Sequence, residues 1–599
     1  MEDIQSYYQT KCKEWEQEIA QLSHQIWIVG TIRLVLVVMA AIGVYLGWNA
    51  GWKVWTGILL LCAIPFIYLM MRHDKLFYKR SYTEVKRTLA EQELQGLAGD
   101  YSAFDGADEE RNADHSFTLD LDVFGPKSLF QLVNRTVTYE GRKQLARWFK
   151  KPLDVPAIIQ QRQEAIRELA TRPDLFFHFY ALGRMKSAAM ADTSGMKQLV
   201  QEPSALGSCA WKLFFWVVPV GWLLLIVGNG MGSIPEIWIG PYLIVSLVIA
   251  YAKAGEVNRL YASVDKLEQS LATHAELLKC LEETPFQAES LQRTQAQWKR
   301  NGRQASASLR TLSRHIGALN QRFSLAGVIL NVLFLRDMRH ALALEAWKTR
   351  HREDIGRWME ALGEMDAFCS AGHFAFTHPD YIYPTFTETY FQMRGKSLGH
   401  PLLDRKVCVR NDVTIPHHPW FLIITGANMA GKSTYLRTIG VNYLLACMGL
   451  PVCAQELTLY PAHLVTSLRT SDSLTSNESY FFAELKRLKM IIDRLQQGEK
   501  LFIILDEILK GTNSLDKQKG SMALMKQLVA YETCGIIATH DLVLGELEKE
   551  FPQQIKNYCF EADIHDDELT FSYRLREGIA QNMNACFLMQ KMGITVSRT

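Results

Sequence analysis

The sequence has no Cys-x-x-Cys pair, no internal repeat and almost no net charge. Its eleven cysteines stand singly between Cys12 and Cys586, which disfavours a disulfide framework and a zinc site and predicts reduced thiols. Sixty-five basic against sixty-three acidic residues give a formal charge of +2, so a site for a polyanion has to be a local patch. At 599 residues the chain is too long for a single core and predicts several domains.

Long hydrophobic runs are plentiful in the first half of the chain. They form two pairs, residues 26–48 with 54–71 and residues 213–228 with 237–252. Each run comes near the roughly 20 residues that span a bilayer, so we expect two transmembrane hairpins. Arg33 interrupts the first run, but it lies close enough to one end to reach the headgroups. Buried core helices are the alternative, more so for the second pair, whose runs are shorter and contain prolines.

Basic residues flank these hairpins and are absent from the linker 229–236. By the positive-inside rule, both termini and the large segments lie in the cytoplasm, which predicts a multi-pass protein of the cytoplasmic membrane. A cleaved secretory signal is not expected, because the first 25 residues are polar and of mixed charge. The flanking basic residues are Arg72, Lys75, Lys79, Arg80, Lys212, Lys253 and Arg259.

The rest of the pattern predicts a helical part followed by an α/β part. We expect an N-terminal segment with the first hairpin (1–81), a linker (82–114), a mostly helical domain (115–378) and an α/β domain (379–599). The second hairpin interrupts the helical domain, which also contains a long helical arm over residues 256–360. Alternating strands and helices after Pro379 predict a parallel sheet with crossover helices.

The main chemical motif lies at the start of this α/β part. An apolar strand from Phe421 runs into Gly-x-x-x-x-Gly-Lys-Ser, and a helical pattern follows. This is the context of a P-loop, whose amides surround phosphates while the lysine reaches the β- and γ-phosphates and the serine binds Mg²⁺. A chance glycine-rich turn lacks such flanks. The predicted nucleotide-binding residues are Gly426, Ala427, Asn428, Met429, Ala430, Gly431, Lys432, Ser433 and Thr434.

Two further apolar strands end in polar side chains. The first ends in Asp506 and Glu507, and the second precedes His540. We predict that Asp506 holds magnesium together with Ser433 and that Glu507 polarises the attacking water. His540 stands where a γ-phosphate sensor is needed. With Lys432, Glu507 and His540 form the predicted catalytic set of an enzyme that uses ATP and Mg²⁺.

These motifs resemble those of the MutS family of DNA mismatch-repair ATPases. The matching segments are Thr425-Gly-Ala-Asn-Met-Ala-Gly-Lys-Ser-Thr, Asp506-Glu-Ile-x-x-Gly-Thr and Ala538-Thr-His, in the family's order and spacing. The resemblance implies a P-loop ATPase domain of the ABC/MutS type behind a helical core and lever domain. It also implies a homodimer joined through the ATPase domains, in which Ser479 completes the nucleotide site of the other subunit.

The sequence departs from the family at several points. Ala427 replaces the usual proline, Leu509-Lys510 replaces Gly-Arg, and Asn477 replaces a glycine of the loop that carries Ser479. None of these changes removes a group that binds phosphate or magnesium, so we expect hydrolysis to survive. The first 110 residues contain no Phe-x-Glu, the family's mismatch wedge, and no connector domain is recognisable. Mismatch recognition by that route is therefore not expected.

One stretch of the arm is a candidate for contact with DNA. Residues 290–336 contain no acidic side chain, and in the family the long helices lead towards a clamp around the duplex. We therefore expect sequence-independent, salt-sensitive binding of double-stranded DNA. Acidic lipid headgroups or a solvated helix face are the alternatives. The predicted DNA-binding residues are Arg293, Lys299, Arg300, Arg303, Arg310 and Arg314.

Taken together, the sequence predicts a membrane-tethered, dimeric MutS-like ATPase that opens and closes its arms on DNA in a repair-related process. The second hypothesis is a membrane-anchored ATP-dependent switch or scaffold for a protein partner. Stimulation of the ATPase by duplex DNA distinguishes the DNA-binding hypothesis from this one. An ABC transporter is a third. Against a transporter, four spans are few, and the loop that carries Ser479 reads Asn-Glu-Ser rather than the Leu-Ser-Gly-Gly type.

Overall fold

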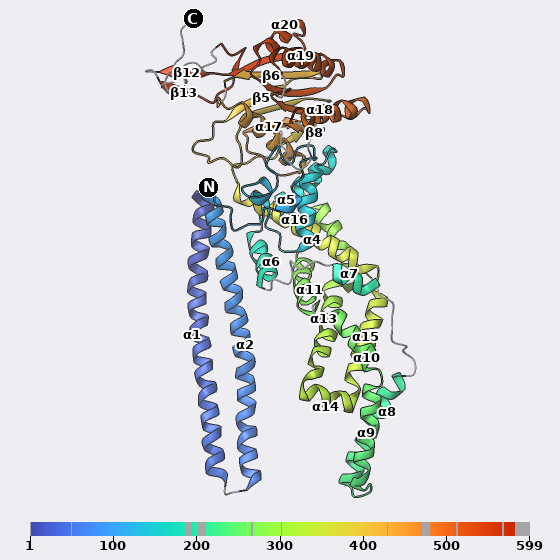
Figure 1. Cartoon of the computed structure of the whole chain (residues 1–599). Helices are drawn as coiled ribbons and strands as arrows, with labels where there is room; N and C mark the ends of the chain where they lie inside the picture. The colour runs from blue at the N-terminus through green and yellow to red at the C-terminus, as the bar shows by residue number, and fades with distance from the viewer. Residues whose placement is uncertain are drawn as a thin grey trace.

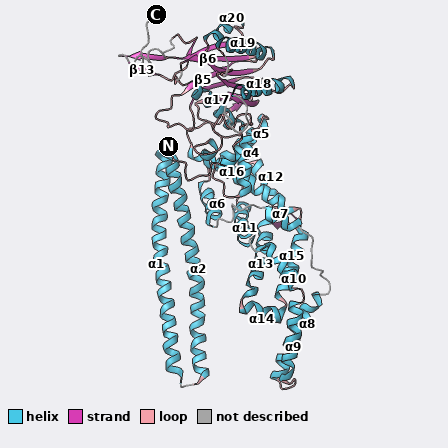
Figure 2. Ribbon diagram, in the orientation of Figure 1, coloured by secondary structure: helices cyan, strands magenta, loops and turns pink. Residues whose placement is uncertain are grey.

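The computed structural model describes residues 2–48, 51–185, 194–201, 211–264, 267–300, 302–427, 429–469, 480–510, 513–565 and 568–581. A mostly helical part is followed by a mixed α/β part, as the sequence predicts. Figure 1 shows the α/β part at one end of the molecule, a helical core beneath it, and two helical extensions that run away from the core in the same direction. Almost all strands lie in the α/β part (Figure 2).

The first extension is a hairpin of α1 (Glu2–Gly47) and α2 (Trp52–Leu97), each of 46 residues and hence about 70 Å long. Helix α2 continues to Leu97, well beyond residue 81, where the sequence predicts that this segment ends. Much of the expected linker is thus helix, because no residue between 82 and 95 breaks the pattern. The helix ends only where Gly96 and Gly99 allow a turn, the latter with φ of 93°.

The apolar runs of the hairpins do not pack into the protein core. In the described residues, α1, α2 and residues 213–230 of α8 (Trp211–Gly230) are long and apolar enough to cross a membrane, and at most 11% of each apolar window is buried. Two bent helix pairs raise the number to five if each pair is one span. One of them contains α9 (Ile239–Tyr251), which pairs with α8. The alternative of buried core helices is wrong for these runs.

The root of the first hairpin is anchored in the helical core by buried polar contacts. Tyr8 on α1 hydrogen-bonds through its hydroxyl to Nε2 of His373, at 3.0 Å. Glu93 on α2 forms a bidentate ion pair with Arg135, and its carboxylate lies 3.4 Å from His373 Nε2. All four side chains are buried. The pKa of Glu93 is held well below its ordinary value, since Arg135 and His373 together outweigh the effect of burial.

The core and the arm are built from short helices around one long one. Helix α16 (Asp354–Thr377) packs against α4 and α5 at the centre of the core. Its Asp366 accepts hydrogen bonds from the backbone of Val137 and Thr138. The core also contains α3 (Leu129–Val133), α4 (Tyr139–Lys150), α5 (Pro156–Ala170), α6 (Pro173–Met185) and α7 (Ser194–Gln201).

The arm is less continuous than the sequence predicts. A two-stranded hairpin, β1 (Lys299–Arg300) and β2 (Arg303–Gln304), interrupts it, and the chain bends by 109° between residues 305–323 and 325–334. The arm helices are α10 (Ala254–Val264), α11 (Glu268–Glu283), α12 (Glu289–Ala296), α13 (Ala305–Asn320), the 3-10 turn η6 (Gln321–Phe323), α14 (Leu325–Phe334) and α15 (Arg336–Arg350).

A six-stranded sheet carries the α/β part, in the order β14-β11-β6-β10-β9-β8. Its strands pair in parallel from β11 to β8, and β14 joins antiparallel at the edge. A smaller sheet has the order β3-β7-β4-β5. The strands of the large sheet are β6 (Trp420–Gly426), β8 (His463–Ser467), β9 (Leu501–Asp506), β10 (Cys534–Thr539), β11 (Ile555–Phe560) and β14 (Arg576–Glu577). The remaining strands are β3 (Thr385–Phe386), β4 (Met393–Leu398), β5 (Asn411–Ile415), β7 (Glu456–Leu459), β12 (Ala562–His565) and β13 (Glu568–Phe571).

Both faces of the large sheet are covered by helices. Leu422 and Ile424 of β6 belong to the cluster that includes α17 (Lys432–Cys447). Phe421 and Ile423 point to the other face, in a cluster with α18 (Tyr480–Gln496), α19 (Ser514–Ala530) and α20 (Leu547–Glu550). Burial on both faces explains why these strands read as unbroken apolar runs. It also fixes where each strand ends, and therefore where its polar residues emerge.

Candidate nucleotide site

The P-loop joins β6 to α17 by a turn that requires glycine. Gly426 has φ of 145° and Gly431 has φ of 106°. A Cβ at Gly426 would lie 2.4 Å from the carbonyl oxygen of Phe560 on β11, so a side chain there would clash with a neighbouring strand. Helix α17 begins at Lys432, directly after the second glycine. Its N-terminal amides therefore face the loop, where an anion is favoured.

Lys432 is buried at the centre of this loop. Its Nζ donates hydrogen bonds to the carbonyl oxygens of Gly426 and Ala427, at 2.7 and 2.9 Å, and lies 3.3 Å from His540 Nε2. Burial lowers the pKa of Lys432 to about 8, although the carboxylates of Asp506 and Glu507 act in the opposite direction. The ammonium group is thus held by weak neutral acceptors, which a phosphate oxygen can replace.

Ser433 and Asp506 form the pair that fits a magnesium ion. The Ser433 hydroxyl donates to Asp506 Oδ2 at 2.5 Å. The second carboxylate oxygen, Oδ1, is buried and has no hydrogen-bond partner in the described part of the chain. Burial raises the pKa of Asp506, a cost that a bound cation would remove. Mg²⁺ takes few protein ligands beside phosphates and water, and one hydroxyl and one free carboxylate oxygen suit that requirement.

Glu507 is clamped between two basic side chains. Its Oε1 lies 2.6 Å from His540 Nε2, and its Oε2 lies 3.3 Å from Lys510 Nζ. The hydrogen bond from His540 lowers the pKa of Glu507 to about 2, so this carboxylate is ionised at neutral pH. The loop that carries Lys510 is fixed in turn by Glu484 on α18, which accepts hydrogen bonds from the backbone N–H of Leu509 and of Lys510. The sequence shows that Lys510 departs from the family pattern, but it does not reveal the contact between Lys510 and Glu507.

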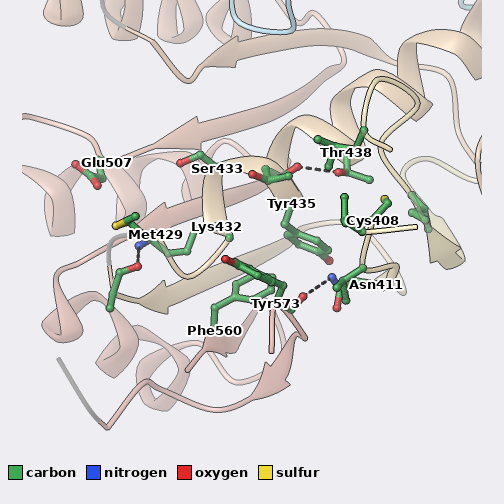
Figure 3. A pocket seen from close by; sticks show the side chains of 17 residues that line it. Cys408, Asn411, Met429, Lys432, Ser433, Tyr435, Thr438, Glu507, Phe560 and Tyr573 are labelled. Carbon is green, nitrogen blue, oxygen red and sulfur yellow. Dashed lines mark hydrogen bonds between the residues drawn. The ribbon is translucent and has the colours of Figure 1, made fainter. Parts of the chain in front are cut away.

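Lys432, Ser433 and Glu507 line one side of a cavity of about 450 Å³. In Figure 3, Glu507 and Met429 lie at one end of the cavity, and Cys408 and Asn411 lie at the other. The rest of the wall is mainly apolar and aromatic, and an apolar lining with a few placed polar groups is typical of a small-molecule site. Sequence motifs did not identify that wall, because its residues come from separate segments without a fixed spacing. They are Leu398, Leu403, Val407, Val409, Phe560 and Tyr573.

Most of the predicted nucleotide-site residues meet in this cavity. Ala427, Met429, Gly431, Lys432, Ser433, Thr434 and Glu507 line it directly. Gly426 and Ala430 shape the loop. Asp506 and His540 reach it through their contacts with Ser433 and Lys432. Asn428 and Ser479 lie outside the described residues.

Two aspartates of the helical core contact the α/β part, and one of them reaches the P-loop helix α17. Asp122 makes a bidentate ion pair with Arg469, at 2.5 and 2.9 Å, and also lies 3.3 Å from the guanidinium of Arg437 on α17. Asp120 accepts hydrogen bonds from the Thr466 hydroxyl and the Arg469 backbone. A displacement of α17 would therefore strain or break these contacts with the core. Sequence analysis missed this contact, because the partners are more than 300 positions apart.

The predicted DNA-binding residues follow one another along the arm but differ in availability. Lys299 and Arg300 lie on β1 and Arg303 on β2. Two others are partly neutralised: Arg293 lies 3.4 Å from Glu289, and Arg310 pairs with Glu276. Arg314 is exposed one turn further along α13. Among the predicted residues whose side chains the structure describes, Arg314 is therefore a better candidate for phosphate contact than Arg293 or Arg310.

Comparison with known proteins gives this architecture a family. Residues 114–372 match the model of MutS domain III, and residues 422–596 match that of MutS domain V. The chain belongs to the MutS family. The MutS domain V match contains the P-loop, both acidic residues and His540, and the MutS domain III match contains the core and the arm. The hydrophobic helices α8 and α9 fall inside the domain III match.

Among the MutS relatives is the DNA mismatch repair protein MutS of Thermotoga sp. (strain RQ2), 30% identical over 235 residues. That alignment covers 39% of this chain and 29% of the relative. MutS protein homolog 4 of Homo sapiens is 28% identical over 244 residues, 39% of this chain and 25% of the relative. The MutS of Thermus thermophilus is 28% identical over 256 residues, 42% and 30% of the two chains. The aligned segments thus span less than a third of each of these MutS proteins.

Proposed function

We propose that this chain is a membrane-tethered MutS-type ATPase that binds and hydrolyses ATP with Mg²⁺ as a dimer and binds double-stranded DNA in a process related to mismatch repair. One observation carries the ATPase assignment. Lys432, Ser433, Asp506, Glu507 and His540 lie at the carboxyl ends of three parallel strands or directly after them, and contacts within hydrogen-bonding distance join Lys432 to His540, His540 to Glu507, and Ser433 to Asp506. Phosphoryl transfer needs this combination of phosphate donors, metal ligands and a base.

The residues divide the work of hydrolysis between them. The α17 amides and Lys432 bind the phosphate groups and stabilise negative charge on them. Ser433 and Asp506 would hold a magnesium ion, which would supply positive charge to neutralise the phosphates. Glu507 is ionised, so it can orient a water molecule and accept its proton. His540 contacts both Glu507 and Lys432. It therefore links the base to the lysine that binds phosphate, and a change at one can alter the position of the other.

The membrane tether is supported by the exposure of the apolar runs. Nearly all of the apolar windows of α1, α2 and α8 lie outside the protein core, and such surfaces are unfavourable in water. A bilayer about 30 Å thick accommodates each of them. The basic residues that flank the hairpins favour an orientation with the ATPase in the cytoplasm.

Binding of DNA and dimerisation are supported by the family. The relatives aligned above include DNA mismatch repair proteins, and the arm presents a basic strand pair, β1 with β2. The resemblance of the loop with Ser479 to the family's trans loop supports a nucleotide site shared by two subunits. A membrane-anchored switch for a protein partner is less favoured, because the arm and core match MutS domain III.

The test uses the full-length protein in detergent or nanodiscs. Binding of labelled ATP with magnesium is measured first, followed by ATPase rates without DNA and with homoduplex, mismatched and branched DNA at low and high salt. We expect tight MgATP binding and salt-sensitive stimulation by duplex. Absence of nucleotide binding would refute the ATPase assignment, whereas ATPase activity that ignores every DNA would favour the protein-partner switch.

A further inference from the structure

Helix α14 stands out at the lower end of the arm, because it is apolar and largely uncovered. It follows η6 in a tight corner: a Cβ at Gly327 would lie 2.1 Å from the backbone oxygen of Gln321. Phe323 and Leu325 are 72% and 80% exposed, and four other large apolar side chains are also exposed. These are Val328, Ile329, Leu330 and Phe334. Residues 321–334 contain no acidic side chain, and an exposed apolar patch of this kind is unfavourable in water.

The length of α14 excludes a simple span. Its ten residues reach about 15 Å, half of the hydrocarbon thickness of a bilayer. The preceding helix is too strongly bent away to extend it, by 109°. An apolar helix that is too short to span and is not buried in the core is typical of a re-entrant or interfacial membrane segment.

The neighbours of α14 are the hydrophobic helices of the second hairpin. Helix α14 contacts both α8 and α9. Leu335, which ends α14, is buried in a small cluster with Val218 of α8 and Ala250 of α9. The exposed apolar face is therefore continuous with the apolar surface of the hairpin.

The orientation of α14 agrees with such a position. In Figure 1, α14 runs across the direction of α1, α2 and the α8–α9 hairpin, and the tips of both hairpins reach the same end of the molecule. The apolar run of α1 begins about 32 Å from its tip, and α8 is about 30 Å long. A bilayer that holds both tips has its near surface close to the first turns of α8, where α14 packs.

Basic side chains gather at this same level. Arg339 donates a hydrogen bond to the carbonyl oxygen of Phe215 on α8 and lies 4.9 Å from the centre of that ring. Arg336 donates to Gln321 at 2.8 Å. Arg259, beyond the end of α9, is exposed. Arginines at the end of a hydrophobic hairpin suit the headgroup region.

We propose that the corner formed by η6 and α14, residues 321–334, is an interfacial membrane element that lies among lipid headgroups with its exposed face against acyl chains. This inference rests on the proposed membrane tether and extends it: the tip of the arm is seated on the bilayer and does not close on DNA. The occupant is lipid rather than a second copy of the chain, because the face continues the apolar surface of a predicted span.

The test places a photoreactive benzoylphenylalanine in the full-length protein, reconstituted in vesicles of phosphatidylethanolamine and phosphatidylglycerol. Phe323 is the first position, because the substitution is aromatic for aromatic, and Ile329 is the second. Leu61, which is 75% exposed on α2, reports the tether. Thr311, exposed on α13 about 18 Å before Phe323, is the matched control outside the membrane. Lipid adducts are counted by mass spectrometry.

We expect lipid adducts at Leu61, Phe323 and Ile329 at yields at least about tenfold above that at Thr311. Adducts at Leu61 without adducts at Phe323 or Ile329 overturn the interfacial assignment and leave the tether standing. Absence of adducts at all positions overturns the tether as well. Cross-links from Phe323 and Ile329 to a second protein copy, without lipid, overturn the choice of occupant.

Discussion

Glu507 reaches the cavity from a backbone with φ of 49°, where its carboxylate meets His540 and Lys510. Replacement by glutamine keeps the shape but removes the proton acceptor. We expect Glu507→Gln to lower the single-turnover rate of ATP hydrolysis by about 10²- to 10⁴-fold with the MgATP dissociation constant nearly unchanged. Glu546→Gln, at an exposed carboxylate of the same domain, is the control and should hydrolyse normally. A normal rate in the Glu507 variant would remove this residue from the role of base.

Because of Lys432, we expect the affinity for MgATP to fall as the pH rises. The charged ammonium binds phosphate, and burial places the pKa of Lys432 near 8 in the nucleotide-free protein. MgATP affinity should therefore be fully developed below about pH 8 and fall by up to about tenfold per pH unit as the pH rises above it. Lys432→Arg keeps its charge throughout this range and should show a flatter profile. Equal slopes for the two proteins in equilibrium binding would contradict the assignment.

At the scale of elements, the root of the α1–α2 hairpin depends on the buried pair of Glu93 and Arg135. Glu93→Ala leaves a buried guanidinium without its partner, and we expect it to destabilise the full-length protein by about 3 to 5 kcal/mol. Denaturant unfolding in detergent measures this loss. Glu91→Ala, two positions away, breaks only a half-exposed pair with Arg87 and should cost no more than about 1 kcal/mol. Similar losses in both variants would mean that the buried pair does not anchor the hairpin.

The elements differ in how far the sequence could predict them. Strands β6, β9 and β10 are buried on both faces, so their apolar runs are unbroken and their polar ends locate Lys432, Asp506 and His540. The extent of α2 was underestimated because the transition at residue 82 is one of polarity and not of helix propensity. The breaks in the arm and the apolar wall that contains Tyr573 depend on tertiary packing. The periodicity of apolar residues along the sequence does not reveal such packing.

At the scale of the whole molecule, the proposed binding of DNA is tested at the strand pair β1 and β2. We expect the triple variant Lys299→Glu, Arg300→Glu and Arg303→Glu to weaken duplex binding and to reduce the salt slope by about 0.9 for each phosphate that the variant no longer neutralises. Fluorescence anisotropy over a range of salt concentrations measures both. Lys549→Glu, at an exposed site on α20, shows what one charge reversal away from the arm does to binding. An unchanged slope in the triple variant would separate this strand pair from DNA.

The two helical extensions leave the core in the same direction (Figure 1), and this restricts how two copies can associate. If both copies insert in one bilayer and also share a nucleotide site, their two-fold axis has to run along the bilayer normal. Rotation of the ATPase domains about that axis would then turn the hairpins within the plane of the lipid, without moving them through it. A duplex held between the two arms would lie parallel to the membrane surface, at a height fixed by the length of the arm.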